Sequence, residues 1–199
     1  MKKKTHILTG KDLLAFEDYL DSNTLFVQNI LGIYAPTLYK MHNEKDVPID
    51  RLTAAIIRFV TNNTEFTDKV PLGHLRKNWD LLDLTLTLTT ASPKNGIKVK
   101  GKLLNPEMSA HIGVLLMRGY TAARRLTTKN DGVSELDQQH LPTRPVSIWI
   151  GFIIYAIENK MPHLIEKVID QEIEAHGTDV EMLLRRAWPS AKIVKPTIK

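Results

Sequence analysis

Strict alternation of apolar and polar residues marks the middle of the chain. Leucine and threonine alternate over Leu84–Thr89, and the alternation resumes over Ile97–Leu103 after a Pro/Asn/Gly-containing cluster at residues 91–96. A period of two on both sides of turn-forming residues is typical of a half-buried hairpin, and Asn-Gly suits its tight turn. The pattern therefore predicts a central β-hairpin with one apolar face. Its polar face carries Thr85, Thr87, Thr89, Lys98, Lys100 and Lys102.

A long helix is predicted directly after the hairpin, from Asn105 to about Thr127. Asn105 is a good N-cap, and Pro106 suits the first helical position. A 3.6-residue period gives this helix a broad apolar arc that can face the core. The arc contains Met108, Ile112, Leu115, Leu116, Gly119, Tyr120, Ala123 and Leu126. The outer side carries His111, Arg118, Thr121, Arg124 and Arg125.

Shorter amphipathic helices are predicted on both sides of this central stretch. Thr9 to Asp12 resembles a capping box and starts a helix that ends near Leu20. A second helix is expected over residues 25–34; it is broken near Pro36, and a further turn reaches Met41. Further helices are expected over residues 51–62, 74–82, 162–176 and 180–188. The 51–62 helix has a buried stripe of Leu52, Ala55, Ile56, Phe59 and Val60. Residues 42–46 are expected to form a polar loop with a solvated His42.

The stretch from Val146 to Asn159 is apolar nearly all round. Such a helix is buried either in a core or in a subunit interface. We favour the core, because a chain of this size needs a central element. The alternative is a seam between subunits.

These patterns predict a mainly α fold with about seven or eight helices and one central β-hairpin. The domain organisation expected is a helical region at residues 1–127 and a second at residues 146–199, packed together as a single domain. Residues 128–145 connect them and contain Gly132, Pro142 and Pro145. A connection of this length is often functional or mobile, so it is a candidate domain boundary or swinging arm, and either a hinge or an insertion is compatible with the sequence.

Composition narrows the class of protein. The chain has 199 residues, of which 43% are hydrophobic and 25% are charged, which is typical of globular proteins. It has no cysteine, which excludes disulfides, cysteine nucleophiles and thiolate metal sites. The basic N-terminus lacks the apolar stretch of a signal peptide, and the longest apolar run, Val146–Ile157, is short of the roughly 20 residues that span a bilayer. We therefore expect a cytoplasmic or nuclear protein that is not secreted and has no transmembrane segment.

Charge is concentrated in the central stretch. Residues 90–129 contain eight lysines and arginines but a single acidic residue, Glu107, which gives a local net charge of +7. The remainder has 19 basic and 21 acidic residues, so the whole excess of +5 comes from this stretch. A basic ribbon beside a basic helix is typical of a surface that binds a polyanion. Alternatively, the lysines lie on a solvated face and protect a sheet edge from aggregation.

Motifs for enzymatic chemistry are absent from the sequence. No GxGxxG or GxxxxGK[ST] loop occurs, and none of the seven histidines is four residues from another. The nearest approach to a catalytic or divalent-metal set is His163, Glu166, Asp170 and Glu174 on one flank of the penultimate helix. The simpler interpretation is that these residues lie on the solvent-exposed flank of an amphipathic helix. We predict no catalytic residue, no metal site and no cofactor.

The absence of zinc-finger, RNP and GXXG motifs limits the mode of nucleic-acid recognition. The aromatic residues nearest the basic stretch are Trp79 and Tyr120, and Tyr120 falls on the buried arc. Trp79 is then the one plausible stacking residue, although a role in the core is equally compatible with its position. Contact would be mainly to the phosphate backbone.

The leading hypothesis is a non-enzymatic nucleic-acid-binding protein with a structural or regulatory role, for either RNA or DNA. Its predicted binding residues are Lys94, Lys98, Lys100, Lys102, Arg118, Arg124 and Arg125. The alternative is an assembly or matrix-like protein whose basic face meets an anionic membrane or an acidic protein, with self-association through the apolar helix or the termini. A hydrolase or transferase that uses the flank of His163 is the third hypothesis.

Overall fold

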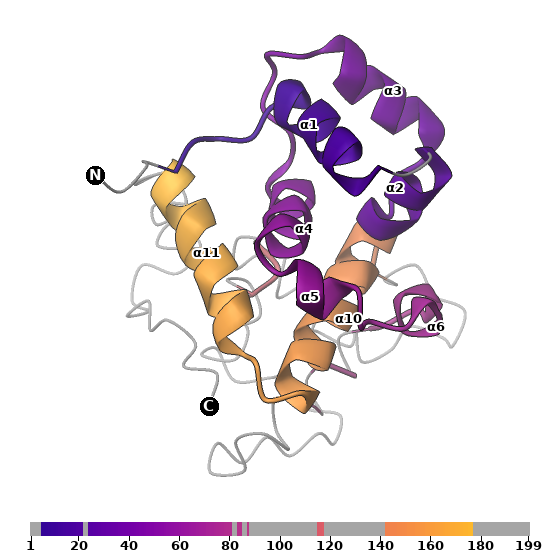
Figure 1. Ribbon diagram of the computed structural model, residues 1–199, viewed down its shortest axis with the longest axis vertical. Coiled ribbons are helices and arrows are strands. Elements are labelled where there is room, and N and C mark those ends of the chain that lie inside the picture. Colours follow the sequence, from indigo (N-terminus) through magenta and orange to yellow (C-terminus); the bar gives the residue numbers. More distant parts are fainter. Residues whose placement is uncertain are drawn as a thin grey trace, which may run out of the picture.

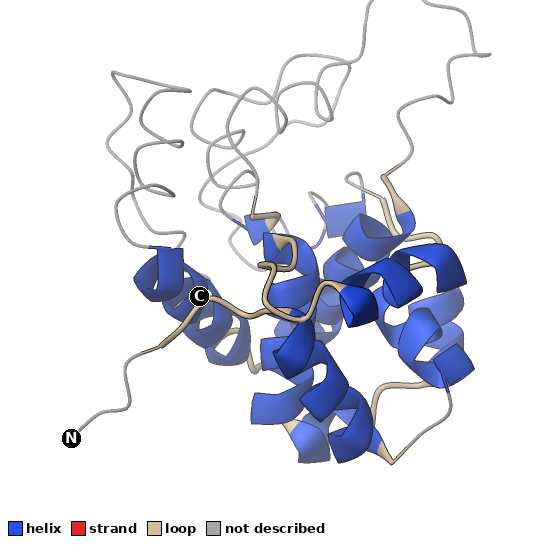
Figure 2. Cartoon of the chain, turned by 90° about the horizontal axis from the view of Figure 1, so that it is seen from above, coloured by secondary structure: helices blue, strands red, loops and turns tan. Residues whose placement is uncertain are grey.

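The computed structural model describes residues 5–21, 24–80, 83–84, 87, 115–117 and 142–176 (Figure 1). This part of the chain folds into helices joined by short connections, which confirms the mainly α class. Figure 2 shows helices and loops but no strand within these residues. The eight helices of the described residues are α1 (Gly10–Leu20), α2 (Thr24–Leu31), α3 (Ala35–Asn43), α4 (Arg51–Asn62), α5 (Thr64–Thr67), α6 (Leu72–Arg76), α10 (Arg144–Glu158) and α11 (His163–His176). None of the described helices combines the length and the apolar character that crossing a membrane requires.

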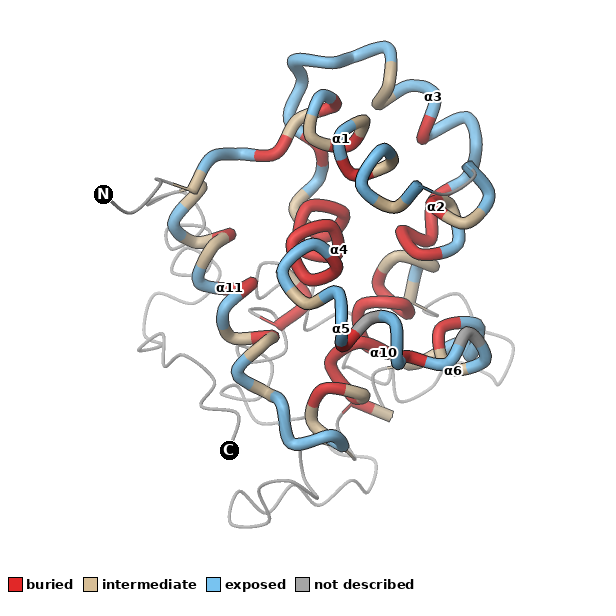
Figure 3. Tube along the Cα trace, viewed as in Figure 1, coloured by how far each residue is buried: buried red, intermediate tan, exposed pale blue. Residues whose placement is uncertain are grey.

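Helix α4 is the centre of the packing. The side chain of Asp50 caps it by accepting hydrogen bonds from the backbone N–H groups of Leu52 and Thr53 at 3.1 and 3.0 Å. Every residue from Leu52 to Val60 is buried, as the nearly continuous red of α4 in Figure 3 shows. The predicted apolar stripe is confirmed, but burial extends around the whole helix because α1, α2, α10 and α11 all pack against it.

Helix α10 supplies the second half of the core, which confirms the predicted core position of the apolar stretch. Its residues from Val146 to Ile154 are all buried. The rings of Trp149 and Phe152 pack against Phe59 of α4, with centroid separations of 6.0 and 4.9 Å. Helix α10 begins at Arg144, two residues earlier than predicted, with Pro145 in its first turn, where the missing proline N–H costs nothing.

Helix α11 lies along α4 with the predicted side inward. Ile165, Val168 and Ile169 are buried, and Leu164 and Ile173 pack partly against the core. The predicted helix over residues 180–188 lies outside the described residues.

Helix α1 begins with the predicted capping box. The Asp12 carboxylate accepts hydrogen bonds from the Thr9 N–H at 2.8 Å and the Thr9 hydroxyl at 3.1 Å. Gly10 allows the start of α1 to approach the end of α3, because a Cβ there would collide with the carbonyl oxygens of Met41 and Glu44. Helices α1 and α3 therefore form a paired layer over α4 (Figure 1).

The predicted boundary between α2 and α3 was wrong by several residues. Helix α2 ends at Leu31 because Gly32 adopts a left-handed conformation, with φ of +68°. Gly32 also lies so close to α10 that a Cβ would meet the Ile148 side chain and the Arg144 backbone. Pro36 does not break a helix here; it lies in the first turn of α3, which it suits.

The predicted first strand of the hairpin is wrong where the structure describes it. Leu84 and Thr87 are helical, and the Leu84 N–H donates to the Asp80 carbonyl at 3.2 Å. Asp80 and Asp83 each accept a hydrogen bond from the other's backbone N–H, at 2.9 and 3.1 Å, which is the geometry of a helix start. The preceding helix, predicted over residues 74–82, is instead α6, which ends at Arg76. The remainder of the predicted hairpin lies outside the described residues.

The predicted long helix after the hairpin is described at residues 115–117 alone. Leu115 and Leu116 are fully buried, as their positions on the apolar arc predicted. Met117 has a φ of +54°, so an uninterrupted helix through this point is wrong. The Leu115 carbonyl accepts a hydrogen bond from the buried Trp149 Nε1 at 2.6 Å.

Candidate functional site

The residues predicted to bind nucleic acid all lie outside the part of the chain that the structure describes. This holds for Lys94, Lys98, Lys100, Lys102, Arg118, Arg124 and Arg125. Their mutual geometry is therefore a prediction from the sequence. The described residues that lead toward them are those of α6 and the turn that follows it.

Trp79, the predicted stacking residue, is anchored to the protein. Its Nε1 donates to the His74 carbonyl at 2.7 Å, and its ring packs partly against the core beside Gly151. The ammonium of Lys77 lies 3.7 Å from the centroid of the Trp79 ring, in a cation–π contact. Of the two roles that the sequence allowed, the described contacts favour the core role.

The basic side chains around α6 are also engaged in structural contacts. Arg144 donates to the carbonyls of Leu75 and Arg76 at 3.1 and 3.4 Å and to Asn78 Oδ1 at 3.2 Å. Lys77 lies 3.4 Å from the Asp83 carboxylate. The Arg144 bonds tie the start of α10 to the end of α6, and the Lys77 contact lies within residues 77–83, so neither cation is simply solvated.

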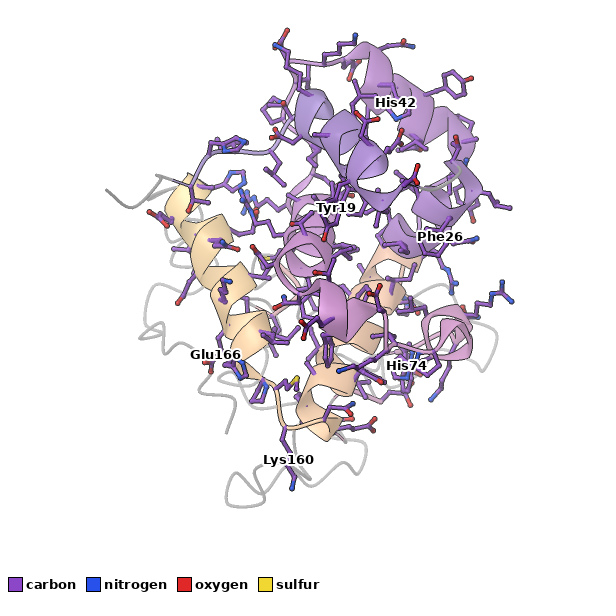
Figure 4. All side chains as sticks on the ribbon, in the orientation of Figure 1. Tyr19, Phe26, His42, His74, Lys160 and Glu166 are labelled. Carbon is purple, nitrogen blue, oxygen red and sulfur yellow. The ribbon has the colours of Figure 1, made fainter. Side chains whose placement is uncertain are left out.

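His74 lies between three aromatic or backbone partners at the junction of α6 and α10 (Figure 4). Its ring is 4.4 Å from that of Trp79 and 5.1 Å from that of Tyr155, measured between centroids. Its Nε2 lies 2.8 Å from the Gly151 carbonyl oxygen, so this nitrogen carries the hydrogen and donates it. The contacts recorded for His74 are thus with rings and a carbonyl, which suits docking of α6 more than acid–base catalysis.

A buried ion pair is the strongest electrostatic feature of the described protein. Arg58 Nε of α4 donates to Glu172 Oε1 of α11 at 2.5 Å, and the two side chains are 10% and 1% exposed. Arg58 Nη2 donates to the His6 carbonyl at 2.5 Å. Glu172 Oε2 has no hydrogen-bond partner among the described residues, and His176 Nε2 lies 3.3 Å from it. We call Arg58, Glu172, His176 and His6 the Arg58–Glu172 cluster.

The Arg58–Glu172 cluster holds the N-terminal residues onto the helices. Besides the His6 carbonyl bond, the Thr5 hydroxyl donates to Glu174 at 2.8 Å, and the Ile49 N–H donates to the Leu8 carbonyl at 3.0 Å. A buried carboxylate whose charge is balanced by an arginine is suited to joining elements. We therefore assign the Arg58–Glu172 cluster a structural role.

Glu172 was not predicted from the sequence, although a signal for it was present. Glu172 lies seven, four and three residues after Ile165, Val168 and Ile169, so the helical period places it on the buried stripe of α11. The flank that the sequence did single out, His163, Glu166, Asp170 and Glu174, is not assembled into a metal site. Within the described residues, no three His, Asp or Glu side chains are grouped closely enough to hold a metal ion.

The prediction that His42 is solvated is also wrong. The sequence predicted a solvated histidine, but His42 Nε2 lies 2.8 Å from Glu17 Oε1 between α3 and α1, and both side chains are about one-fifth exposed. Tyr39 packs beside it, with ring centroids 6.3 Å apart. The pair joins the two helices of the outer layer, and a polar loop pattern alone does not reveal that α1 supplies its carboxylate.

Charge is divided unevenly between the described residues and the remainder of the chain. The described residues contain eleven lysines and arginines against sixteen acidic residues, a net charge of −5. The remaining residues contain sixteen basic and six acidic residues, a net charge of +10. The net negative charge therefore lies in the described helices and their connections, and the net positive charge lies in the rest of the sequence.

No family model, no curated protein and no solved structure matches this chain significantly.

Proposed function

We propose that this protein binds nucleic acid non-enzymatically, by contacts to the phosphate backbone, in a structural or regulatory role such as coating, packaging or repression. The residues proposed to make these contacts are Lys94, Lys98, Lys100, Lys102, Arg118, Arg124 and Arg125.

The observation that supports the proposal is the segregation of charge. Residues 90–129 carry a net charge of +7, whereas the described helices and their connections carry −5. A polyanion approaching such a molecule is attracted to one part and repelled by the other, so its orientation is fixed before contact. If the same net charge of +5 were distributed evenly over the molecule, it would not orient the polyanion in this way.

The environment of Trp79 supports recognition of the backbone over recognition of bases. Its Nε1 is satisfied by the His74 carbonyl, and Lys77 lies over its ring. A nucleobase would have to displace Lys77 to stack on that face. We therefore expect weak dependence on base sequence and strong dependence on salt.

The test is fluorescence anisotropy with short single-stranded RNA and with duplex DNA. Replacing Lys98, Lys100 and Lys102 with glutamate should weaken binding by at least a hundredfold, because three phosphate contacts are lost and three repulsions are introduced. The matched control reverses three exposed lysines of the described helical part, Lys69, Lys160 and Lys167, and should weaken binding far less. Circular dichroism on both variants verifies that the helices are intact.

Equal binding by the two triple variants would contradict the proposal. Absence of binding to both nucleic acids, combined with sedimentation on vesicles containing anionic lipid, would instead support the assembly or matrix-like role. The two measurements together thus choose between the two classes of partner.

A further inference from the structure

Exposed apolar side chains gather in the first 50 residues of the chain. Seven large apolar side chains are exposed among the described residues, and six of them lie between Ile7 and Val47; the seventh is Met161. The most exposed are Tyr34 at 76%, Tyr39 at 66% and Leu25 at 64%. Single exposed apolar residues are ordinary, but three exposed tyrosines, on α1, on α3 and at the N-cap of α3, indicate a contact surface.

Helix α3 is covered on one side alone. Leu38 is its single buried residue, and α1 is the one described helix that packs extensively on it. Tyr39 lies near the seam between the two helices, because it contacts His42, which pairs with Glu17 of α1. Figure 3 shows the exposed outer side of both helices, and Figure 4 shows Tyr19 on α1 and His42 on α3. We call Tyr19, Tyr34, Tyr39, Asp18, Asp21 and Glu44 the α1–α3 surface.

The charge of this layer identifies the chemistry of what it binds. Described residues 5–50 contain seven acidic side chains against three lysines, a net charge of −4. Two of these lysines, Lys11 and Lys40, already pair with Asp46 and Glu44. No ion pair of Asp18 or Asp21 occurs in the part of the chain that the structure describes. Tyrosine rings and carboxylates together favour lysine and arginine side chains on an apolar segment.

Residues 177–199 have this chemistry. They contain five lysines and arginines against two acidic residues, a net charge of +3, and the basic residues are interleaved with large apolar ones. The basic residues are Arg185, Arg186, Lys192, Lys195 and Lys199, and the apolar residues include Met182, Leu183, Leu184 and Trp188.

The fold brings the start of this segment close to the first turn of α1, at one end of the α1–α3 layer. Helix α11 ends at His176, and Glu174 in its last turn accepts a hydrogen bond from Thr5 at 2.8 Å. The next residue, His6, is 2.8 Å from Asp12 in the first turn of α1. The 23 residues that follow His176 can extend roughly 75 Å at about 3.3 Å each, which is more than enough to reach α3. A tether of this kind gives an effective concentration on the order of millimolar, well above that of a second copy at micromolar concentration.

We propose that residues 177–199 dock on the α1–α3 surface of their own chain, with their basic side chains against its carboxylates and tyrosines. The docked segment covers the outer side of α3. The contact does not depend on nucleic-acid binding, because none of the seven proposed phosphate-binding residues belongs to it.

Hydroxyl-radical footprinting of the full chain tests the docking. Reversing Arg185 and Arg186 to glutamate should raise the modification rates of Tyr34 and Tyr39 several-fold, since the segment is released. Met161, which is 40% exposed between α10 and α11, is the internal standard and should not change. The matched control replaces the exposed residues Lys160 and Lys167 with glutamate. This changes the net charge of the protein by the same amount, but at a place away from the α1–α3 surface. Adding Asp18→Lys and Glu44→Lys to the arginine variant should restore protection.

Carbodiimide cross-linking of the unmodified chain provides a second test. Because it needs no variant, it remains valid even if the arginine variant fails to fold. Lys192, Lys195 or Lys199 should be joined to carboxylates of the α1–α3 surface. In an equal mixture of unlabelled and heavy-nitrogen-labelled protein, each link should join two peptides that are both unlabelled or both labelled, because the contact lies within one chain. Unchanged tyrosine rates in the arginine variant, links of mixed label, or the absence of such links would overturn the proposal.

Discussion

Buried polar residues decide how the described helices are joined. Arg58 lies on α4 and Glu172 on α11, and the arginine also reaches the His6 carbonyl, so one guanidinium connects three parts of the chain. Removing a charge from water is costly, and the attraction between the pair repays that cost only while both partners are present. The cluster therefore makes the association of α4 with α11 specific, and it is vulnerable to loss of either side chain.

Replacing Glu172 with leucine should lower the free energy of unfolding by about 3–5 kcal/mol, because the Arg58 guanidinium is left buried and unpaired. The double variant Arg58→Met with Glu172→Leu should recover about 2 kcal/mol or more of that loss, since no buried charge remains. Urea unfolding of the single and double variants measures both quantities. A double variant no more stable than the single one would contradict this role for the pair.

Asp12 gives stability that depends on pH. Partial burial tends to raise the pKa of its carboxyl, but the hydrogen bonds from His6 and Thr9 and the charge of His6 outweigh this, so the pKa falls below its ordinary value of 3.8. A carboxyl with a lowered pKa in the folded state stabilises the protein above the ordinary pKa, and the stabilisation is lost as the pH falls through the lower, folded value.

The variant Asp12→Asn should be less stable than the wild-type protein by about 1 kcal/mol at neutral pH, through loss of the charged capping box. The difference in unfolding free energy should shrink as the pH is lowered below about 4 and the wild-type carboxyl becomes protonated. Urea titrations at neutral pH and near pH 3 measure it. A difference that stays constant across this range would show that the charge of Asp12 is not involved.

At the scale of helices, the sequence predicted the features that depend on residues close together in the chain, namely where a helix starts and which side of it is buried. The capping box of Thr9 and Asp12 located the start of α1, and the apolar period located the buried side of α11. The Leu/Thr alternation at Leu84 failed because Asp80 and Asp83 cap each other's backbone and start a helical turn there. Apolar residues at every second position cannot by themselves distinguish a strand from such a turn.

Contacts between helices were not predictable, because they depend on residues distant in sequence. Gly151 of α10 is an example: a Cβ there would lie 2.7 Å from Trp79 Cδ1 and 2.9 Å from its Nε1. Trp79 cannot retreat without losing its bond to the His74 carbonyl. Nothing in the local sequence of α10 shows that a tryptophan some 70 residues earlier occupies this space.

Gly151→Ala should lower the free energy of unfolding by about 1–3 kcal/mol, as expected for overpacking, and should shift Trp79 fluorescence. The matched control is Gly73→Ala in α6, where a Cβ would meet nothing within 4 Å. That change should be neutral or should stabilise the protein by up to about 1 kcal/mol, since alanine is the better helix former. Thermal and urea unfolding compare the two, and an equal effect at both glycines would argue against the close approach of Trp79 to α10.

At the scale of the whole molecule, the protein combines an acidic helical part with a basic remainder. The described residues carry −5 and the rest +10. The sequence predicted the location of the basic residues along the chain, because charge is read directly from residue types. It did not predict their mutual arrangement, because such an arrangement depends on residues distant in sequence. It also missed the Arg58–Glu172 cluster, whose partners are separated by more than a hundred residues.

The salt dependence of nucleic-acid binding tests the central claim most directly. If the seven named side chains contact phosphates, a plot of log K against log salt for single-stranded RNA should have a slope of about −5, from roughly −0.7 per contact. Replacing Lys98, Lys100 and Lys102 with glutamine should reduce the magnitude of the slope by about 2. The same replacement at Lys69, Lys160 and Lys167 should leave it unchanged. A slope near zero, or one that the two triple variants share, would contradict phosphate binding through the basic stretch.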